Sequence, residues 1–343
     1  MSVNFAILGS GMSAALHAKA LSGLKGSANA VGFFSVDEES AREFSLAYGI
    51  PQYSSYDRLL DDPAVDAVII CTPSGLHAEH AVAAMKKGKN VLVEKPAVVT
   101  PEQAETLLRA EREYDIKVAS VSQLRLFCDV KKLKKDISRG TFGKITLATL
   151  NMNYYRPQSY YDMASWRGSA KLDGGTLMNQ GLHGIDLLIY FFGQPVMVSA
   201  FRKTAARQME SEDTAAAIIE FRNGVYAVVS ASSCTYPGSP RRLEICGTEG
   251  SAVLTEDKIT LRDTVRDGKW HAKPSDYLSF NDPAAVPQEA HREVLRNFAD
   301  HIEHGTPPIS TLADGCNSAC LIDAVYRSAD TGESVVPRYF RTV

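Results

Sequence analysis

A regular alternation of short apolar strands and helical patterns between residues 3 and 120 constrains this chain more than any other feature. Runs typical of strands occur at 4–9, 30–35, 64–72, 90–96 and 117–123, with helical patterns between them at 13–24, 38–50, 75–88 and 100–115. Strands and helices that alternate at this spacing predict a parallel sheet with helices on both faces. The helix expected at 100–115 has a matching start signal: an N-cap at Thr100, a first-turn proline at Pro101 and a partial capping box with Gln103.

The pattern changes after residue 140, where strands follow one another with little room for helices between them. Strand-like runs occur at 144–155, 196–204, 215–221, 225–236, 241–248 and 251–257, and helical patterns at 181–193, 291–305 and 312–330. Asn223-Gly224 between two of these runs is a strong hairpin signal. We therefore expect an α/β protein of two domains: a doubly wound parallel sheet over 1–122, and an α/β domain with an open, largely antiparallel sheet over 123–343.

Length, charge and cysteine usage narrow the class of protein. A chain of 343 residues with 45% hydrophobic content can fill two cores. A net charge of -3 argues against nucleic acid as a partner, and the basic run at 131–135 is typical of a solvated helix face. The six cysteines form no C-x-x-C pair, so neither a metal site nor a disulfide framework is expected.

No run approaches the roughly 18 apolar residues of a membrane span, and the N-terminus lacks the basic region of a signal peptide. We expect a cytoplasmic protein with no membrane partner.

The turn between the first strand and the first helix carries Gly9, Gly11 and Ala14 in a G-x-G-x-x-A pattern. Glycines at these positions permit a tight turn and a close approach of the backbone to a ligand. The helix N-terminus that follows offers N–H groups and a positive dipole end to a pyrophosphate. The motif in this context predicts a dinucleotide site.

The end of the second strand bears on the choice between NAD and NADP. An acid at this position usually holds the ribose of NAD, whereas this chain has Ser35, with Asp37, Glu38 and Glu39 just beyond. A serine leaves room for the extra phosphate of NADP, but three carboxylates repel it. The pattern favours NAD and leaves NADP open.

Two further strands end on polar residues. "ICTPSGLHAEH" places Thr72 and Pro73 after the third strand, and "VLVEKPAVVT" ends the fourth on Glu94 and Lys95. In an open parallel sheet the ligand crevice lies outside the carboxyl ends of the strands, so these segments should converge there with the glycine turn. A lysine at the mouth of a buried strand is costly to desolvate, which suggests a cleft that uses an ammonium. Alone, E-K-P is more typical of a strand that simply ends on charges.

Histidines and amides supply further candidates. His77 is expected to open a helix and line the cleft, and His80 to lie on the surface, since two histidines are too few for a metal site. The segment 153–188 is rich in arginine and aromatic residues, and Asn179 and His183 in it are four residues apart, so they share a face of a helix beginning near Leu177. Either alone is usually a satisfied core polar group, but together, in this segment, they suggest a sugar or hydroxyl site.

Four motifs in this order resemble the Gfo/Idh/MocA family of NAD(P)-dependent oxidoreductases over nearly the whole chain: "LGSGMSA", "CTPSGLHAEHA", "VEKPAVVT" and "DGGTLMNQGLHGIDLL". The resemblance implies a Rossmann domain, then an α/β domain whose open sheet commonly mediates oligomerisation, and thus a homodimer or homotetramer. It also implies a sugar, cyclitol or nucleotide sugar as substrate. "YYRPQSYYD" and "SWRGSAKLDGGTLMNQ" are similar to the branch that acts on UDP-N-acetylglucosaminuronate.

The resemblance also implies roles for individual residues. Lys95 and His183 correspond to the catalytic pair, while Asn179 stands where the family often has an aspartate. Substrate-binding residues are expected to be Arg156, Tyr160 and Asn179. Cofactor-binding residues are expected to be Gly9, Gly11, Met12, Ser13, Ser35, Thr72, Pro73, His77, Glu94, Lys95, Gln123, Trp166 and Arg167.

The expected reaction moves a hydride between the nicotinamide and a carbinol carbon. His183 takes the hydroxyl proton, Lys95 donates to the oxygen, and Glu94 helps to position Lys95 or the cofactor. Two alternatives stay open: a family member that keeps its cofactor bound, as a shuttle or in NAD-assisted glycoside elimination, and a non-catalytic dinucleotide-binding sensor.

Overall fold

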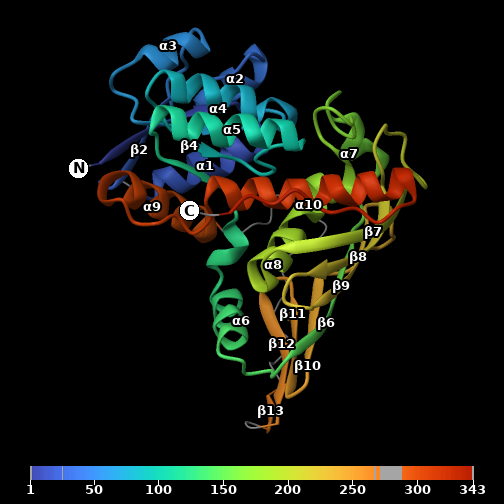
Figure 1. Cartoon of the computed structure of the whole chain (residues 1–343). Helices are drawn as coiled ribbons and strands as arrows, with labels where there is room; N and C mark the ends of the chain where they lie inside the picture. Colours follow the sequence, from blue (N-terminus) through green and yellow to red (C-terminus); the bar gives the residue numbers. More distant parts are fainter. Residues whose placement is uncertain (1, 25, 266–267, 271–287, 342–343) are drawn as a thin grey trace. The chain divides into compact units, whose positions relative to one another are not determined.

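The computed structural model describes residues 2–24, 26–265, 268–270 and 288–341. The chain forms two compact units (Figure 1). Unit 1 comprises Met1–Gln123, Val286–Cys316 and Arg341–Val343, and unit 2 comprises Leu124–Ala285 and Asn317–Phe340. Unit 1 therefore takes a segment from the C-terminal part of the chain in addition to its N-terminal residues.

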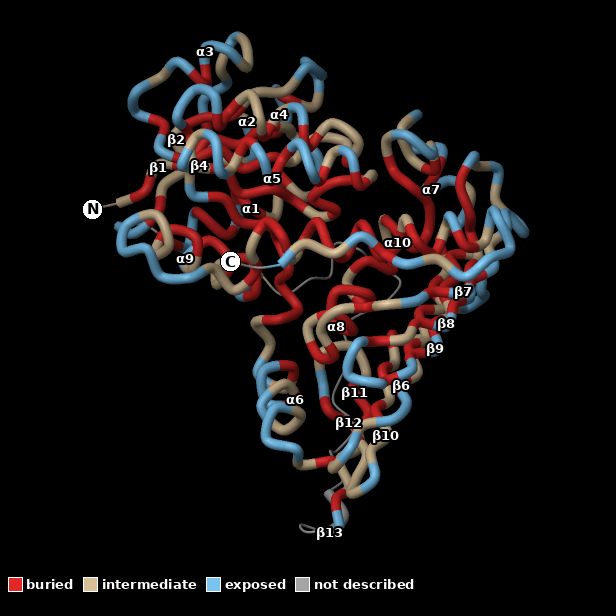
Figure 2. The backbone as a smooth tube through the Cα atoms, viewed as in Figure 1, coloured by how far each residue is buried: buried red, intermediate tan, exposed pale blue. Residues whose placement is uncertain are grey.

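The sheet of unit 1 is wholly parallel, with the strand order β2-β1-β3-β4-β5. Its strands are β1 (Val3–Leu8), β2 (Ala28–Phe34), β3 (Ala67–Ile70), β4 (Asn90–Val93) and β5 (Val118–Ser120). Leu8 pairs with Ile70 and Ile70 with Val93, so β1, β3 and β4 end at the same level. All of β3 is buried, as expected for the centre of a parallel sheet. The neighbouring β4 is also mostly buried (Figure 2). The predicted parallel sheet is confirmed.

Helices cover this sheet, and capping side chains fix where several of them begin. The helices are α1 (Met12–Ser22), α2 (Glu38–Tyr48), α3 (Tyr56–Asp61), α4 (His77–Lys86), α5 (Pro101–Tyr114) and α9 (Gln288–His304), with a 3-10 turn η1 (Ser74–Leu76). Thr100 accepts a hydrogen bond from the Gln103 N–H, which confirms the predicted cap of α5. Helix α1 packs on α9 and α4 on α5. The ring of Phe298 in α9 lies 6.3 Å from that of Phe5, so α9 belongs to the core of unit 1.

The sheet of unit 2 has the order β13-β12-β11-β10-β6-β9-β8-β7 in the described residues. Its strands are β6 (Ile145–Asn153), β7 (Pro195–Lys203), β8 (Thr214–Phe221), β9 (Tyr226–Ser232), β10 (Arg242–Gly247), β11 (Gly250–Thr255), β12 (Lys258–Thr264) and β13 (Gly268–Trp270). The predicted largely antiparallel sheet is confirmed, but β6 and β9 pair in parallel, and β12 and β13 were not predicted. Asn223-Gly224 joins β8 to β9 as predicted, and Gly224 has φ 84°, which glycine adopts without strain.

Helix α8 covers the inner face of this sheet. The helical elements of unit 2 are α6 (Cys128–Ser138), α7 (Gln158–Asp162), the π-helical η3 (Leu177–Gly181) and α8 (Leu182–Phe192), while η2 (Gln123–Leu126) and α10 (Leu312–Thr331) belong partly to each unit. A Cβ on Gly184 of α8 would lie 2.5 Å from Met152 Sδ of β6. Glycine at this position therefore lets α8 pack directly on the sheet.

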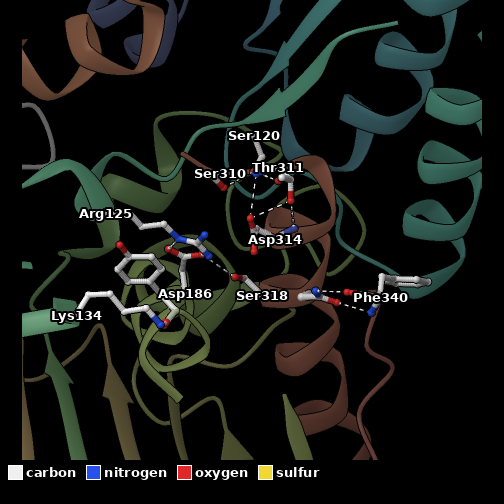
Figure 3. Close-up of polar contacts among 11 residues, drawn as sticks. Ser120, Arg125, Lys134, Asp186, Ser310, Thr311, Asp314, Ser318 and Phe340 are labelled. Atoms are coloured by element: carbon white, nitrogen blue, oxygen red, sulfur yellow. Dashed lines mark hydrogen bonds and ion pairs between the residues drawn. The ribbon is translucent and has the colours of Figure 1, made fainter. Parts of the chain in front are cut away.

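A buried ion pair fixes α8 within unit 2 (Figure 3). Arg125 donates from Nε and Nη2 to the two carboxylate oxygens of Asp186, at 2.9 and 2.7 Å. Ser318 Oγ of α10 donates to the same carboxylate at 3.1 Å, and the Arg125 guanidinium lies 4.8 Å from the centre of the Tyr190 ring. This bidentate geometry offsets the desolvation of both charges, and it holds α8 to η2 and α10.

We expect Asp186→Ala to lower the free energy of unfolding by about 3–5 kcal/mol, because it leaves the Arg125 charge buried and unpaired. The matched control is Asp330→Ala, which removes a bidentate pair with Arg202 whose carboxylate is more than half exposed. That loss should be about 1 kcal/mol or less. Chemical denaturation measures both variants, and equal losses would contradict the role assigned to the buried pair.

Candidate active site

The glycine-rich turn of unit 1 lies where β1 and β3 end. Gly9 has φ 117°, and a Cβ added there would lie 2.6 Å from the carbonyl oxygen of Cys71, which follows β3. Only glycine fits this position. Gly11 caps α1 without a side-chain hydrogen bond, and a Cβ there would meet nothing within 4 Å. The N–H groups of Met12 and Ser13 at the start of α1 can therefore receive an anion, which fits the pyrophosphate of a dinucleotide.

Three serines connect this turn to the end of β2. Ser10 Oγ lies 2.9 Å from Ser35 Oγ and 2.7 Å from Ser40 Oγ. Asp37 caps α2 by accepting a hydrogen bond from the Ser40 N–H at 2.9 Å. The position where a ribose-binding acid usually stands is thus occupied by a serine that is hydrogen-bonded to the glycine-rich turn.

A cavity of about 460 Å³ lies beside the start of α2. Its lining residues are Glu38, Gln52, Tyr53 and Ser54. Gln52 forms a main-chain bridge with Phe33 of β2, so the cavity lies near the carboxyl end of that strand, where such folds bind the adenosine half of a dinucleotide. Residues 52–54 were not predicted as site residues, because this loop carries no motif.

The histidines after β3 are more deeply buried than predicted. His77 is almost fully buried, with Nδ1 2.7 Å from the Pro96 carbonyl oxygen and Nε2 2.7 Å from that of Thr72. It therefore joins two loops, where the sequence analysis predicted that it lines a cleft. His80, predicted at the surface, is partly buried: its Nδ1 lies 3.1 Å from Thr72 Oγ1, and its ring meets Tyr56 edge-on. Burial lowers the pKa of both histidines.

Glu94 follows β4 and is buried among histidines of α1 and α9. Its Oε1 lies 2.9 Å from His17 Nε2, and its Oε2 accepts a hydrogen bond from the Lys95 N–H at 2.9 Å. The ring of His291 meets that of His17 edge-on at 5.4 Å. Burial acts to raise the pKa of Glu94, but the hydrogen bond and charge of His17, with His291 and Lys95, lower it to about 2. Glu94 is therefore a carboxylate at neutral pH, bonded to the backbone of Lys95.

The structure brings most of the predicted cofactor residues to one edge of the parallel sheet. Gly9, Gly11, Met12 and Ser13 follow β1, Ser35 follows β2, Thr72, Pro73 and His77 follow β3, Glu94 and Lys95 follow β4, and Gln123 follows β5. Trp166 and Arg167, predicted for the same role, lie in unit 2, together with the predicted substrate residues.

Unit 2 gathers arginine and amide side chains around Tyr160 of α7. The guanidinium carbons of Arg167 and Arg156 lie 4.3 and 5.9 Å from the centre of the Tyr160 ring. Arg167 donates to the Tyr160 hydroxyl at 2.6 Å, and Arg156 donates to Gln180 Oε1 at 3.0 Å. Arg167 also lies 4.7 Å from the ring centre of Trp166. Guanidinium, hydroxyl and amide groups in one cluster suit a polyhydroxylated or anionic ligand.

Asn179 lies in η3, and His183 follows in the first turn of α8. The helix predicted to begin near Leu177 is present, but its first turn is π-helical, a form found frequently at functional sites. Asn179 Nδ2 donates to Asp173 Oδ1, and Asn179 Oδ1 accepts a hydrogen bond from Gln180 at 2.8 Å. A carboxylate thus contacts the amide that stands where the resemblance leads one to expect an aspartate.

A buried carboxylate, Glu212, holds the start of η3. Its main-chain oxygen accepts a hydrogen bond from the Thr176 N–H at 3.0 Å. Its Oε1 accepts hydrogen bonds from the Leu177 N–H at 2.8 Å and from the Tyr326 hydroxyl at 3.0 Å. A Cβ on Gly175 would overlap Glu212 Oε2, so glycine leaves room for the carboxylate. Burial raises the pKa of Glu212 to about 7, although the bonds from Leu177 and Tyr326 oppose the shift.

Four residues of the candidate site were not predicted from the sequence: His17, His291, Gln180 and Glu212. Their partners lie far away along the chain: His17 and Glu94 are 77 residues apart. One signal marks His17, because it is an imidazole among the small apolar residues of "AALHAKAL". No comparable signal marks the others.

Within the described ranges, no group of three or more His, Cys, Asp or Glu side chains is placed to hold a metal ion. None of the helices in those ranges has the length and apolar character that crossing a bilayer requires.

Glu212→Gln should change how the unfolding temperature depends on pH. A carboxyl whose pKa rises from 4.5 to about 7 on folding loses up to about 3 kcal/mol of stabilisation as the pH rises through that window. Glutamine stays neutral, so the variant should gain stability relative to the native protein between pH 5 and pH 8. Thermal unfolding at the two pH values measures this gain. Glu210→Gln, at an exposed neighbour, is the control, and parallel pH profiles for Glu212→Gln and the native protein would contradict the shift.

The two halves of the chain match two family models. Residues 3–122 match "Oxidoreductase family, NAD-binding Rossmann fold", and residues 134–337 match "Oxidoreductase family, C-terminal alpha/beta domain". Together the two matches cover most of the chain.

Named relatives agree with these matches. The chain is 27% identical to scyllo-inositol 2-dehydrogenase (NADP(+)) IolW of Bacillus subtilis, over 87% of this chain and 86% of that protein. It is 26% identical to inositol 2-dehydrogenase of Rhizobium meliloti, over 96% and 97%. The WlbA dehydrogenase from Bordetella pertussis, solved in complex with NADH and UDP-GlcNAcA, has a TM-score of 0.87 and 29% identity, over 99% of this chain and 100% of that one. The predicted resemblance is confirmed, and the chain belongs to the Gfo/Idh/MocA family of NAD(P)-dependent oxidoreductases, with an NAD-binding Rossmann domain followed by the family's C-terminal α/β domain.

Proposed function

We propose that this oxidoreductase transfers a hydride between a nicotinamide and a carbinol carbon of a sugar, cyclitol or nucleotide sugar. The observation that carries the proposal is the place of Lys95, which follows β4 at the same sheet edge as the Gly9 turn. An ammonium at that edge can stabilise an oxygen whose charge changes during the reaction. The inositol dehydrogenases among the relatives and the NADH-bound WlbA structure support this class of reaction.

Of the two cofactors, we favour NAD. Asp37, Glu38 and Glu39 are exposed just beyond β2, and carboxylates there repel the 2′-phosphate of NADP. No arginine lies between Ser35 and Glu39 to offset them. The glycine-rich turn itself serves either dinucleotide, since both carry the same pyrophosphate.

Two side chains act on the reacting hydroxyl in this proposal. The bound cofactor supplies the hydride acceptor or donor. His183 of unit 2 takes the hydroxyl proton, a role that suits imidazole because its reference pKa lies near neutrality. Lys95 of unit 1 donates a hydrogen bond to the reacting oxygen. Asn179 bonds the same hydroxyl or its neighbour without titrating, and Asp173 holds the Asn179 amide.

The side chains around Tyr160 favour a substrate that carries an anionic group. Planar guanidinium groups such as those of Arg156 and Arg167 pair well with carboxylate or phosphate oxygens. Arg167 has no carboxylate partner in the described ranges, and its Nε is buried without a hydrogen bond there. We therefore favour sugar acids and nucleotide sugars over uncharged cyclitols. The UDP-GlcNAcA in the WlbA structure is a ligand of this kind.

Purified protein should bind NAD more tightly than NADP in calorimetry, and it should form NADH with UDP-sugar uronates or sugar acids. Lys95→Met and His183→Asn should each lower kcat by about 100- to 10,000-fold, with much smaller changes in NAD affinity. Lys87→Met and His304→Asn, at exposed positions, are matched controls that should leave turnover unchanged.

Several outcomes would overturn this assignment. Turnover that survives both Lys95→Met and His183→Asn would remove the proposed mechanism, and a folded protein that binds neither dinucleotide would remove the reaction. Turnover without release of free NADH would instead identify a cofactor shuttle or an elimination enzyme. Dinucleotide binding without turnover on any substrate class would identify a sensor.

We also infer that unit 2 forms a homo-oligomer through its sheet. The outer face carries an apolar band made of Leu147, Phe201, Ile218, Tyr226 and Val228. Phe201 is 80% exposed and Ile218 53%. Ile218 lies opposite Val228, and Leu147 opposite Tyr226, so these side chains adjoin on one face. An exposed apolar patch of this kind marks an interface. A symmetric contact with a second copy would bury it in a dimer, or in a tetramer built from dimers.

The double variant Phe201→Lys, Ile218→Lys should sediment as a monomer in analytical ultracentrifugation, because buried charge on both sides of a symmetric contact is strongly unfavourable. Leu46→Lys on α2, which is 81% exposed, is the matched control and should sediment as the native oligomer. A native protein that is monomeric at micromolar concentration would contradict this interface.

A further inference from the structure

Lys95 lies in a turn whose main chain is held on both sides by buried histidines of unit 1. Glu94 precedes it and contacts His17 of α1. Pro96 follows it and contacts His77 of α4. Neither histidine is one of the reacting groups of the proposed reaction, and both are almost completely buried.

On the Pro96 side, the imidazole of His77 connects the turn to the loop after β3. Nδ1 lies 2.7 Å from the Pro96 carbonyl oxygen, and Nε2 lies 2.7 Å from the Thr72 carbonyl oxygen. Carbonyl oxygens only accept hydrogen bonds, and a neutral imidazole carries one N–H. Because Pro96 adjoins Lys95, the contact at Nδ1 is the one that bears on the lysine.

On the Glu94 side, the connection runs through a carboxylate. His17 Nε2 lies 2.9 Å from Glu94 Oε1, and Glu94 Oε2 accepts a hydrogen bond from the Lys95 N–H at 2.9 Å. Because Glu94 is ionised, its contacts with His17 and with the Lys95 N–H are charge-assisted, and such hydrogen bonds are stronger than neutral ones. The backbone N–H of Lys95 is thereby fixed to α1.

We propose that His17 and His77 are positioning residues for Lys95. A lysine ammonium sits at the end of a flexible four-carbon stem, so its reach is defined only if the backbone that carries it is fixed. A displacement of about 1 Å at a reacting group can lower a rate about 100-fold. The inference rests on the proposed function, because it assumes that the Lys95 ammonium acts on the reacting oxygen.

Two substitutions at His77 separate its two contacts. Asn places its amide nitrogen near the position of Nδ1 and can donate to Pro96, whereas Gln reaches the position of Nε2 and can donate only to Thr72. His77→Asn should therefore keep kcat within about 3-fold of the native value, and His77→Gln should lower kcat by about 10- to 100-fold. The KM for NAD should change little in either variant, because neither contact involves the glycine-rich turn.

A second pair tests His17 in the same way. His17→Gln keeps a donor near the position of Nε2, and His17→Asn is too short to reach Glu94. The Gln variant should stay close to the native kcat, and the Asn variant should lose about 10- to 100-fold. His301→Gln is the matched control, since His301 Nδ1 also meets a main-chain carbonyl, that of Thr306 at 2.8 Å, at a position that does not contact the Lys95 turn.

The difference in kcat between the two variants of each pair decides whether the inference holds. Retained kcat in His77→Asn and His17→Gln, with loss in their counterparts at unchanged melting temperature, supports positioning. Equal kcat within both pairs overturns it, whether all four variants are active or all are impaired. If the His77 variants fail to fold, the His17 pair alone decides. Lys95→Met in the same assay separates the two proposals: full turnover in Lys95→Met removes the catalytic role proposed for Lys95, whereas its loss together with fully active histidine variants removes only this inference.

Discussion

The close contact between the Gly9 turn and the end of β3 is the constraint on which the candidate site in unit 1 depends. The absence of a Cβ lets Gly9 lie against the Cys71 carbonyl. The segments that follow β1 and β3 therefore leave the sheet at one point. The strand order reverses between β1 and β3, since β2 lies on one side of β1 and β3 to β5 lie on the other, and such a switch point leaves a crevice at the carboxyl ends of the strands. Glu94 and Lys95 follow at the same edge of the sheet because β4 is paired in register with β3.

Buried ionisable groups lie beneath several segments that carry candidate residues. Glu94 lies under the Lys95 turn, Glu212 under the start of η3, and the Arg125–Asp186 pair beside α8. Each group is bonded to backbone N–H groups or to an opposite charge, which offsets its desolvation. A buried group with several directed bonds allows fewer arrangements than an apolar contact of the same size. These groups therefore limit the orientations open to the segments above them.

Local signals in the sequence predicted local structure well. The G-x-G turn, the Thr100 cap and the Asn223-Gly224 hairpin each act within one turn of chain, and each is present in the structure. The position of Lys95 at the end of a strand was predicted from the apolar run that precedes it, and Lys95 follows β4 in the structure. These features depend on neighbouring residues, so a single sequence shows them.

Long-range contacts could not be predicted in this way. Tight turns in the sequence predict only antiparallel pairs of consecutive strands. The parallel pairing of β6 with β9 joins strands that are not consecutive, so it was not predicted. His80 was predicted at the surface because its partners Tyr56 and Thr72 belong to other elements. Glu212 carries no motif at all, since its role comes from Leu177 and Tyr326.

The assignment of α9 to unit 1 has a consequence for how the protein is made. Phe5 and His17 emerge early from the ribosome, but their partners Phe298 and His291 are synthesised near the end of the chain. Until then the apolar side of α1 and β1 has no cover from α9, and incomplete domains of this kind expose surface that chaperones bind. The dinucleotide-binding unit is thus the first to begin translation but lacks part of its core until α9 is made, so a chain truncated before α9 lacks part of the core of its N-terminal half.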